Sequence, residues 1–256
     1  IDGWLRVIEE VNASNKTVAT EMDFPSELGQ RVMQVNAIPE FDENEKLESV
    51  LVVSHDITER KMIELEIQNK NKKITESINY AKRIQTAILP NNRVINKTLP
   101  DSFILYKPRD VVSGDFPWYM QVKDDIFIAA VDCTGHGVPG ALLSLIGYFL
   151  LNDIVRSRKV TEPGIILDLL DVGVTKTFRQ DEDSTTKDGM YYALGKINSQ
   201  SREVEYAGAH RPLYAMKGGV MEEVKGNKFP IGGGIYKNQT YFTNPTLTLS
   251  AGDSIY

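Results

Sequence analysis

The sequence predicts an α+β fold, and three observations lead to this prediction. Short runs of β-branched and aromatic residues, separated by Gly, Asn and Asp, fill the second half of the chain. Two helix-like segments, residues 140–156 and 163–179, are grouped between these runs, and a separate set of strand-like runs lies near the N-terminus. Helices grouped between antiparallel strands are typical of helix-on-sheet layers. The length of 256 residues favours two domains.

Residues 1–58 are predicted to contain an antiparallel meander. Its strand-like runs cover residues 16–22, 30–41 and 47–57, and the polar sequence DENEK separates the last two. The pattern then changes from strand-like to helix-like at DITERKMIE. Asp56 or Thr58 can accept hydrogen bonds from the free amides of a helix, and Glu59 follows Asp56 by three residues, as in a capping box.

Residues 59–90 are predicted to form one long helix that ends before Pro90. A heptad frame places apolar residues along one seam of this helix, with some polar members that could fix the register. We therefore expect a helical linker that forms a parallel coiled-coil homodimer, with an amphipathic helix lying on its own domain as the alternative. The two core positions of the frame are Arg60, Ile67, Ile74, Ala81 and Ile88, and Ile63, Lys70, Ser77 and Ile84.

Residues 91–256 are predicted to form the second domain. Seven strand-like runs, punctuated by Gly, Asn and Asp, surround the two helical segments. The runs cover residues 102–108, 124–132, 189–198, 203–210, 212–219, 220–226 and 247–256.

Composition excludes several classes of function. With 35 acidic and 29 basic residues, the formal charge of -6 offers no overall attraction for nucleic acid or for an anionic membrane surface. The only cysteine, Cys133, excludes an internal disulfide and a multi-cysteine zinc site, which fits a reducing, cytoplasmic compartment. We find no signal peptide, and the apolar stretch at residues 141–151 is too short for a bilayer span of about 20 residues. That stretch is expected to be a core helix.

The sequence VDCTGHGVPG, residues 131–140, places an acidic residue and a histidine among three glycines, directly after an apolar run. One interpretation is a tight turn, in which the glycines supply positive φ and Asp132 and His136 are turn residues. A phosphate-binding loop is a poor match, because the lysine and the Ser/Thr of a P-loop are missing. The third interpretation is a site for Mg²⁺ or Mn²⁺, in which Asp132 converges with Asp115 of VVSGDFPWY from an adjacent antiparallel strand.

Several motifs in consistent order carry a family resemblance. YKPRDVVSGDF, AAVDCTGHGVPGALLSLIG, KDGMYYAL, VEYAGAHRPLY and GNKFPIGG together resemble the SpoIIE-like branch of the metal-dependent serine/threonine protein phosphatases, the PPM family. The match extends over about residues 84–256. The N-terminal meander, closed by HDITERK, resembles the C-terminal part of a PAS sensor domain. The resemblance implies a β-sandwich flanked by helices, with two Mg²⁺ or Mn²⁺ ions at one end.

The resemblance also implies roles for individual residues. Asp115 and Asp132 would be metal ligands, together with the backbone carbonyl of Cys133, and the nucleophile would be water activated by the two ions. His136 would protonate the leaving seryl or threonyl oxygen, or would only brace the turn. Arg109 would bind the substrate phosphate as a bidentate donor, or would be a solvated charge.

The chain departs from the family pattern at several positions. Asp188 is a weaker site candidate, because Tyr191 stands where the branch usually has another aspartate, and His210 stands where related chains often have Asn. Two further family aspartates fall downstream of Tyr256, and Asp253 does not take their role. We therefore interpret the phosphatase domain as C-terminally incomplete and expect this chain by itself to hold metal loosely and to hydrolyse phosphoprotein poorly or not at all.

The function that the resemblance implies is metal-dependent dephosphorylation of phosphoserine or phosphothreonine on a regulatory protein, under control of an N-terminal sensor module. The expected partner is a phosphorylated regulatory protein such as an anti-sigma-factor antagonist. The alternative is a non-catalytic sensor or scaffold whose phosphatase-like domain binds a partner without turnover.

Overall fold

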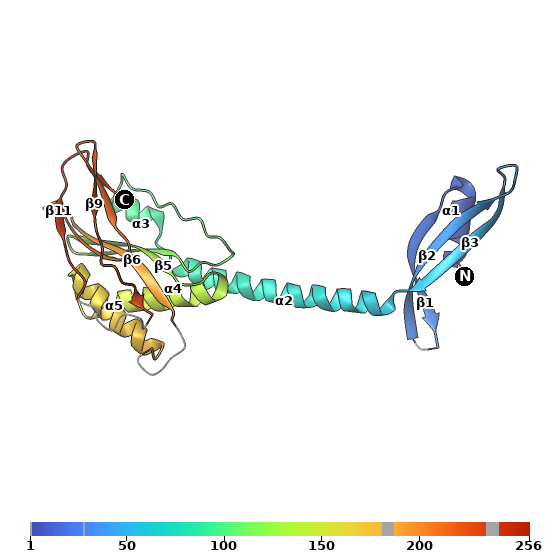
Figure 1. Ribbon diagram of the computed structural model, residues 1–256, viewed down its shortest axis with the longest axis horizontal. Helices are drawn as coiled ribbons and strands as arrows, with labels where there is room; N and C mark the ends of the chain where they lie inside the picture. Colours follow the sequence, from blue (N-terminus) through green and yellow to red (C-terminus); the bar gives the residue numbers. More distant parts are fainter. Residues whose placement is uncertain (1, 28, 181–186, 234–240) are drawn as a thin grey trace. The chain divides into compact units, whose positions relative to one another are not determined.

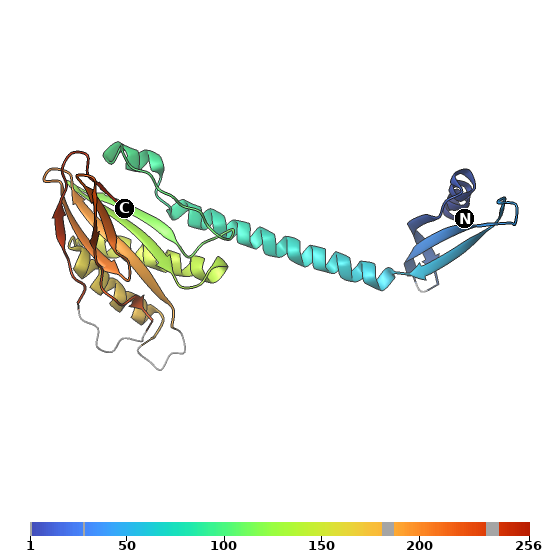
Figure 2. The same cartoon turned by 45° about the horizontal axis from the view of Figure 1, so that its top comes forward.

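The computed structural model describes residues 2–27, 29–180, 187–233 and 241–256. The chain divides into two compact units, Ile1–Glu76 and Ser77–Tyr256 (Figure 1; Figure 2). The predicted division of residues 1–90 into a meander up to residue 58 and a linker to residue 90 stays a proposal, because the unit boundary falls within the long helix.

The first unit is a helix packed on a three-stranded antiparallel sheet. Strands β1 (Val18–Ser26), β2 (Gly29–Phe41) and β3 (Leu47–Asp56) lie in the order β1-β2-β3, which confirms the predicted meander. Helix α1 (Asp2–Ser14), which the sequence analysis did not predict, buries Val7 and Val11 against Ala37 of β2. The resemblance of this unit to a PAS domain stays a prediction.

Helix α2 (Thr58–Ile88) is the predicted long helix. The Asp56 carboxylate accepts hydrogen bonds from the backbone amide and the hydroxyl of Thr58, so Asp56 fixes the start of the helix, as the capping pattern predicts. Ile63, Ile67 and Ile74 of the heptad seam are 50, 52 and 56% exposed. The helix ends two residues before Pro90, as expected.

The second unit has three layers. The main sheet has the order β11-β7-β6-β5-β4, with β10 paired to β6, and a smaller sheet has the order β12-β8-β9. Helices α4 and α5 pack on one face of the main sheet around a core that includes Phe127, Leu167 and Tyr192 (Figure 1). A second core, which includes Tyr206 and Ala215, joins the two sheets. This arrangement confirms the predicted α+β sandwich flanked by helices.

The second unit adds one short helix and the strands and helices of the layers, in chain order. Helix α3 (Asn92–Thr98), which is capped by the Asn91 side chain, was not predicted. The others are β4 (Phe116–Val122), β5 (Asp125–Cys133), α4 (Gly137–Asn152) with a π-helical continuation (Asp153–Ser157), α5 (Pro163–Thr177), β6 (Gly189–Asn198), β7 (Glu203–Ala209), β8 (Leu213–Lys217), β9 (Val220–Val224), β10 (Ile231–Gly232), β11 (Thr246–Thr248) and β12 (Ser254–Ile255).

The strand predicted at residues 102–108 is wrong. This segment is irregular and pairs with no strand in the described part of the chain. The side chains of Phe103 and Leu105 are 79 and 87% exposed to solvent. A run of β-formers becomes a strand only where a neighbouring edge offers hydrogen-bond partners, and its own alternation of side chains cannot supply that edge.

The segment from Gly137 to Ser157 is long and apolar enough, by length and composition alone, to cross a membrane. It is instead the helix that packs on the main sheet and buries Gly140, Leu143, Gly147 and Leu151. A β-carbon on Gly147 would lie 2.8 Å from the Tyr192 hydroxyl, so this glycine lets the helix approach β6 closely. The prediction of a core helix is confirmed.

Candidate metal centre and active site

The two predicted aspartates lie opposite each other at one end of the β4–β5 hairpin. Phe116 of β4 pairs with Val131 of β5, so Asp115, just before β4, faces Asp132. Partial desolvation raises the pKa of Asp115, and the charge of the neighbouring Asp132 carboxylate and a hydrogen bond with it raise that pKa further. Two carboxylates this close repel each other when both are ionised, and a bound cation relieves that repulsion.

Glycines bring the two aspartate-bearing loops into backbone contact. A β-carbon on Gly114 would lie 2.9 Å from the carbonyl oxygen of Gly135 and 3.1 Å from that of Cys133. A β-carbon on Gly140, in the first turn of α4, would lie 2.9 Å from the Cα of Gly114. Real β-carbons essentially never approach other atoms so closely, so glycine is required at both positions. The carbonyl of Cys133 therefore lies beside the segment that carries Asp115.

The Cys133 side chain points into the core and is 3% exposed. Burial, together with the charges of Asp115 and Asp132, raises the pKa of the thiol far above its usual value. The thiol is therefore protonated at neutral pH and is a poor nucleophile.

His136 is the N-cap residue of α4 and lies on the surface of the same loop. Its Nδ1 atom is 3.0 Å from Oδ2 of Asp110, and both side chains are accessible to solvent. Sequence reasoning predicted a role for His136 but missed Asp110. The only signal was the position of Asp110 within the motif YKPRDVVSGDF.

Arg109 lines a pocket of about 620 Å³ beside this histidine. The pocket brings the start of α4 against the segment that precedes Asp115, but neither Asp115 nor Asp132 is part of its wall. The lining residues are Ile78, Arg109, Asp110, Val111, Val112, Gly137 and Val138.

Arg211 is a second site residue that sequence reasoning missed. Its guanidinium forms an ion pair with the Asp132 carboxylate and lies 4.9 Å from the centre of the Tyr191 ring. The Tyr191 and His210 rings pack edge to face, with 5.5 Å between their centres. His210 has φ of 57°, a left-handed conformation that Asn adopts more readily than most other residues.

Asp188 lies against the turn that follows Asp132. The Thr134 hydroxyl donates to Asp188 Oδ1 over 3.2 Å and accepts a hydrogen bond from the Gly189 amide over 3.1 Å. These contacts join the turn to the start of β6. Within the described residues, no group of three or more His, Cys, Asp and Glu side chains is arranged to hold a metal ion. The candidate donor set is therefore two carboxylates and a carbonyl.

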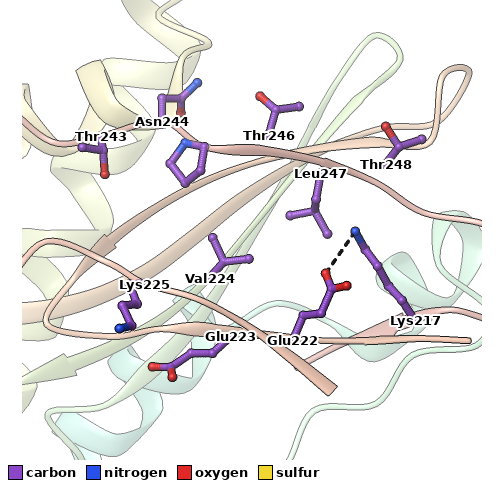
Figure 3. A pocket seen from close by; sticks show the side chains of 11 residues that line it. Lys217, Glu222, Glu223, Val224, Lys225, Thr243, Asn244, Thr246, Leu247 and Thr248 are labelled. Atoms are coloured by element: carbon purple, nitrogen blue, oxygen red, sulfur yellow. Dashed lines mark ion pairs between the residues drawn. The ribbon is translucent and has the colours of Figure 1, made fainter. Parts of the chain in front are cut away.

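A larger pocket, of about 860 Å³, lies elsewhere, between β9 and the segment that leads into β11 (Figure 3). Lys217 and Glu222 form an ion pair of 3.4 Å in its wall, and threonines such as Thr246 and Thr248 lie across from them. None of the predicted site residues lines this pocket.

Comparison with known proteins gives matches to phosphatase domains. The family model described as Stage II sporulation protein E (SpoIIE) matches residues 123–256, just over half of the chain. The solved SiaA-PP2C domain of Pseudomonas aeruginosa is 35% identical with a TM-score of 0.63, covering 73% of this chain and 71% of that domain. The chain belongs to the SpoIIE family. The fold of this SpoIIE-family domain is that of the PPM-type, or PP2C, serine/threonine phosphatases.

Two other solved structures are more distant from this SpoIIE-family chain. The RsbU and RsbW domains of Rv1364c from Mycobacterium tuberculosis are 20% identical with a TM-score of 0.45, covering 58% of this chain and 39% of that one. The PP2C phosphatase domain and regulatory-domain fragment of SpoIIE from Bacillus subtilis are 23% identical with a TM-score of 0.46. The match covers 56% of this chain and 39% of that one. No curated protein matches the chain.

Proposed function

We propose that this SpoIIE-family chain provides the catalytic fold of a metal-dependent phosphatase that acts on phosphoserine or phosphothreonine of a regulatory protein. The observation that carries the proposal is the juxtaposition of Asp115 and Asp132 at the end of the β4–β5 hairpin. Membership of the SpoIIE family and the likeness to the SiaA-PP2C domain support the same activity.

The residues at this end of the hairpin fit Mg²⁺ or Mn²⁺. Carboxylate and carbonyl oxygens are the donors that hard divalent ions prefer. Asp115, Asp132 and the carbonyl of Cys133 supply them, and Gly114 keeps the two loops close enough to act together. When bound, two such ions supply an activated water and neutralise the charge of the phosphoryl group.

Surface residues beside the aspartates suit the roles of general acid and phosphate-binding residue. In this proposal His136 protonates the leaving oxygen, and the Asp110 carboxylate, 3.0 Å from Nδ1, orients the ring so that Nε2 is free for the substrate. Arg109 binds the substrate phosphate from the neighbouring pocket wall. A phosphorylated side chain can approach because Asp115 and His136 are both accessible to solvent.

The proposal extends to the partners of the chain. The substrate is a phosphorylated regulatory protein, such as an anti-sigma-factor antagonist, in the cytoplasm. The N-terminal unit is a sensor of PAS type, and α2 pairs with α2 of a second copy through Ile63, Ile67 and Ile74. The exposure of these three apolar side chains supports the pairing, because a partner helix would remove them from water.

The direct test is phosphate release from a phosphoserine-bearing protein with Mn²⁺ or Mg²⁺ and with a chelator. We expect metal-dependent release that falls at least 10–100-fold in Asp115→Asn and in Asp132→Asn. Asp124→Asn is the matched control, because Asp124 lies in the turn at the other end of the same hairpin. Normal turnover in either site variant at saturating metal would remove that aspartate from the centre.

A non-catalytic partner-binding role is the second candidate, and the small donor set favours it. Hard divalent ions take about six oxygen ligands, and the described residues supply three. On this candidate, the chain binds the phosphorylated partner but releases no phosphate at any metal concentration. A pull-down with the phosphorylated and unphosphorylated partner, run beside the phosphate assay, separates the two functions.

A further inference from the structure

Gln85 of α2 is a buried amide that joins the long helix to the loop of the candidate metal centre. Its side chain is 5% exposed. Its Nε2 atom donates to the carbonyl oxygen of Ser113 over 2.5 Å, and its Oε1 atom accepts from the amide of Ser113 over 3.1 Å. Nε2 also donates to the hydroxyl of Ser144 in α4 over 2.9 Å. One side chain therefore satisfies both backbone groups of Ser113 and holds α4.

This cluster concentrates most of the buried polar side chains that the structure describes. The buried polar residues in the described part of the chain are Thr58, Gln85, Ser113 and Ser144, and Gln85 contacts both serines. A buried polar group costs free energy unless it is hydrogen-bonded, and an aliphatic residue of similar size would fill the same space without that requirement. The amide at position 85 therefore indicates a need for hydrogen bonds to Ser113 rather than for packing alone.

Ser113 in turn restrains Asp115 through a hydrogen bond. The hydroxyl of Ser113 accepts a hydrogen bond from the Asp115 amide over 3.1 Å, and Gly114 between them packs against the carbonyls of Gly135 and Cys133. The backbone on both sides of Gly114 is thus fixed, by Gln85 from one side and by the Asp132-bearing loop from the other. The direction of the Asp115 carboxylate depends on both contacts.

We propose that Gln85 is a positioning residue for the metal centre, which holds the Ser113–Asp115 segment so that Asp115 faces Asp132. This inference rests on the proposed metal-dependent function. Groups that orient metal ligands without touching the metal typically contribute 10–100-fold to metal affinity. Loss of the Gln85 amide leaves both backbone groups of Ser113 without their partner and frees the segment to shift.

The test compares Mn²⁺ binding to the whole chain and to three variants by calorimetry. Gln85→Leu keeps the volume but removes the amide, and we expect Mn²⁺ affinity to fall about 10–100-fold. Ser113→Ala keeps the contacts to Gln85 but removes the bond to the Asp115 amide, and a loss in the same direction is expected. Ser144→Ala is the matched control, because it removes one hydrogen bond of the same amide without touching the Asp115 segment, and its affinity should change less than about twofold.

Hydrogen exchange gives a second readout that does not depend on metal. The Asp115 amide should exchange faster in Gln85→Leu than in the unaltered chain, whereas amides in the middle of β5 should not change. If Gln85→Leu does not fold, Gln85→Met replaces it: the unbranched side chain has nearly the shape of glutamine but lacks the amide, so weaker Mn²⁺ binding is again expected.

The outcomes separate this inference from the proposed function. Mn²⁺ binding and phosphate release by the unaltered chain, with the same Mn²⁺ affinity in Gln85→Leu, would overturn the role of Gln85 and leave the phosphatase proposal intact. Failure of the unaltered chain both to bind Mn²⁺ and to release phosphate would overturn both.

Discussion

Arg211 and Asp132 form an ion pair at the mouth of the candidate metal centre, 79 residues apart in the sequence. Their side chains are 43 and 44% exposed, and the Tyr191 ring supports the guanidinium from one side. Arg211 therefore places a positive charge next to Asp132, one of the two carboxylates proposed to bind metal. A cation that binds Asp132 has to compete with this guanidinium.

The first prediction concerns this competition. Arg211→Gln should strengthen Mn²⁺ binding by up to about fivefold, because solvent-exposed ion pairs contribute up to about 1 kcal/mol. On the proposed function, the same variant should also lower kcat/KM for a phosphoprotein, because a guanidinium displaced from Asp132 by the metal can donate to the incoming phosphate, as Arg109 does. Calorimetry and phosphate release measure the two effects. Arg158→Gln is the control, because Arg158 forms a comparably exposed pair with Asp153 away from the site. Weaker Mn²⁺ binding in Arg211→Gln would contradict the competition.

The second prediction concerns the stability of the metal-free chain. The folded state raises the pKa of Asp115, so the folded chain binds more protons than the unfolded chain and loses stability as the pH rises through that pKa. Asp115→Asn removes the effect and should raise Tm at pH 7 in chelator by no more than about 2 °C. The gain should shrink toward pH 4, as the carboxyl becomes protonated. Thermal melts across this range measure it, and a gain that grows on acidification would contradict the repulsion with Asp132.

The third prediction concerns assembly through α2. Ile74 is 56% exposed on the helix and lies on the predicted heptad seam. We expect the chain to be a dimer at micromolar concentration by sedimentation, and Ile74→Lys to dissociate it by burying an unpaired charge. Thr75→Lys adds the same charge next to the seam and should leave the dimer intact. A monomeric unaltered chain would rule out the coiled coil.

The fourth prediction concerns Cys133, for which only the backbone carbonyl has a proposed role. Cys133→Ser should leave turnover nearly unchanged, while the buried hydroxyl lowers the free energy of unfolding by about 1–3 kcal/mol. Activity at a temperature well below Tm separates the two effects. Inactivation of a folded Cys133→Ser chain would favour a thiol nucleophile over water.

Much of the fold and part of the site could be predicted from local sequence. The β4–β5 hairpin brings Asp115 opposite Asp132 because a hairpin fixes the register of residues that are close in the chain. Apolar runs with turn residues between them likewise predicted β5, β6 and β7. Helix α2 has a clear start at Asp56 and a stop at Pro90, so its extent was also visible in the sequence.

The sequence by itself therefore determined the α+β class, the long helix and the pair of carboxylates, because each depends on residues that are neighbours in the chain. Only the tertiary structure decided that Arg211 pairs with Asp132, that Asp110 contacts His136 and that Gln85 holds Ser113. It also decided that residues 102–108 do not form a strand. These features depend on which distant segments meet when the layers pack, and a local pattern of apolar and polar residues carries no information about the identity of a distant partner.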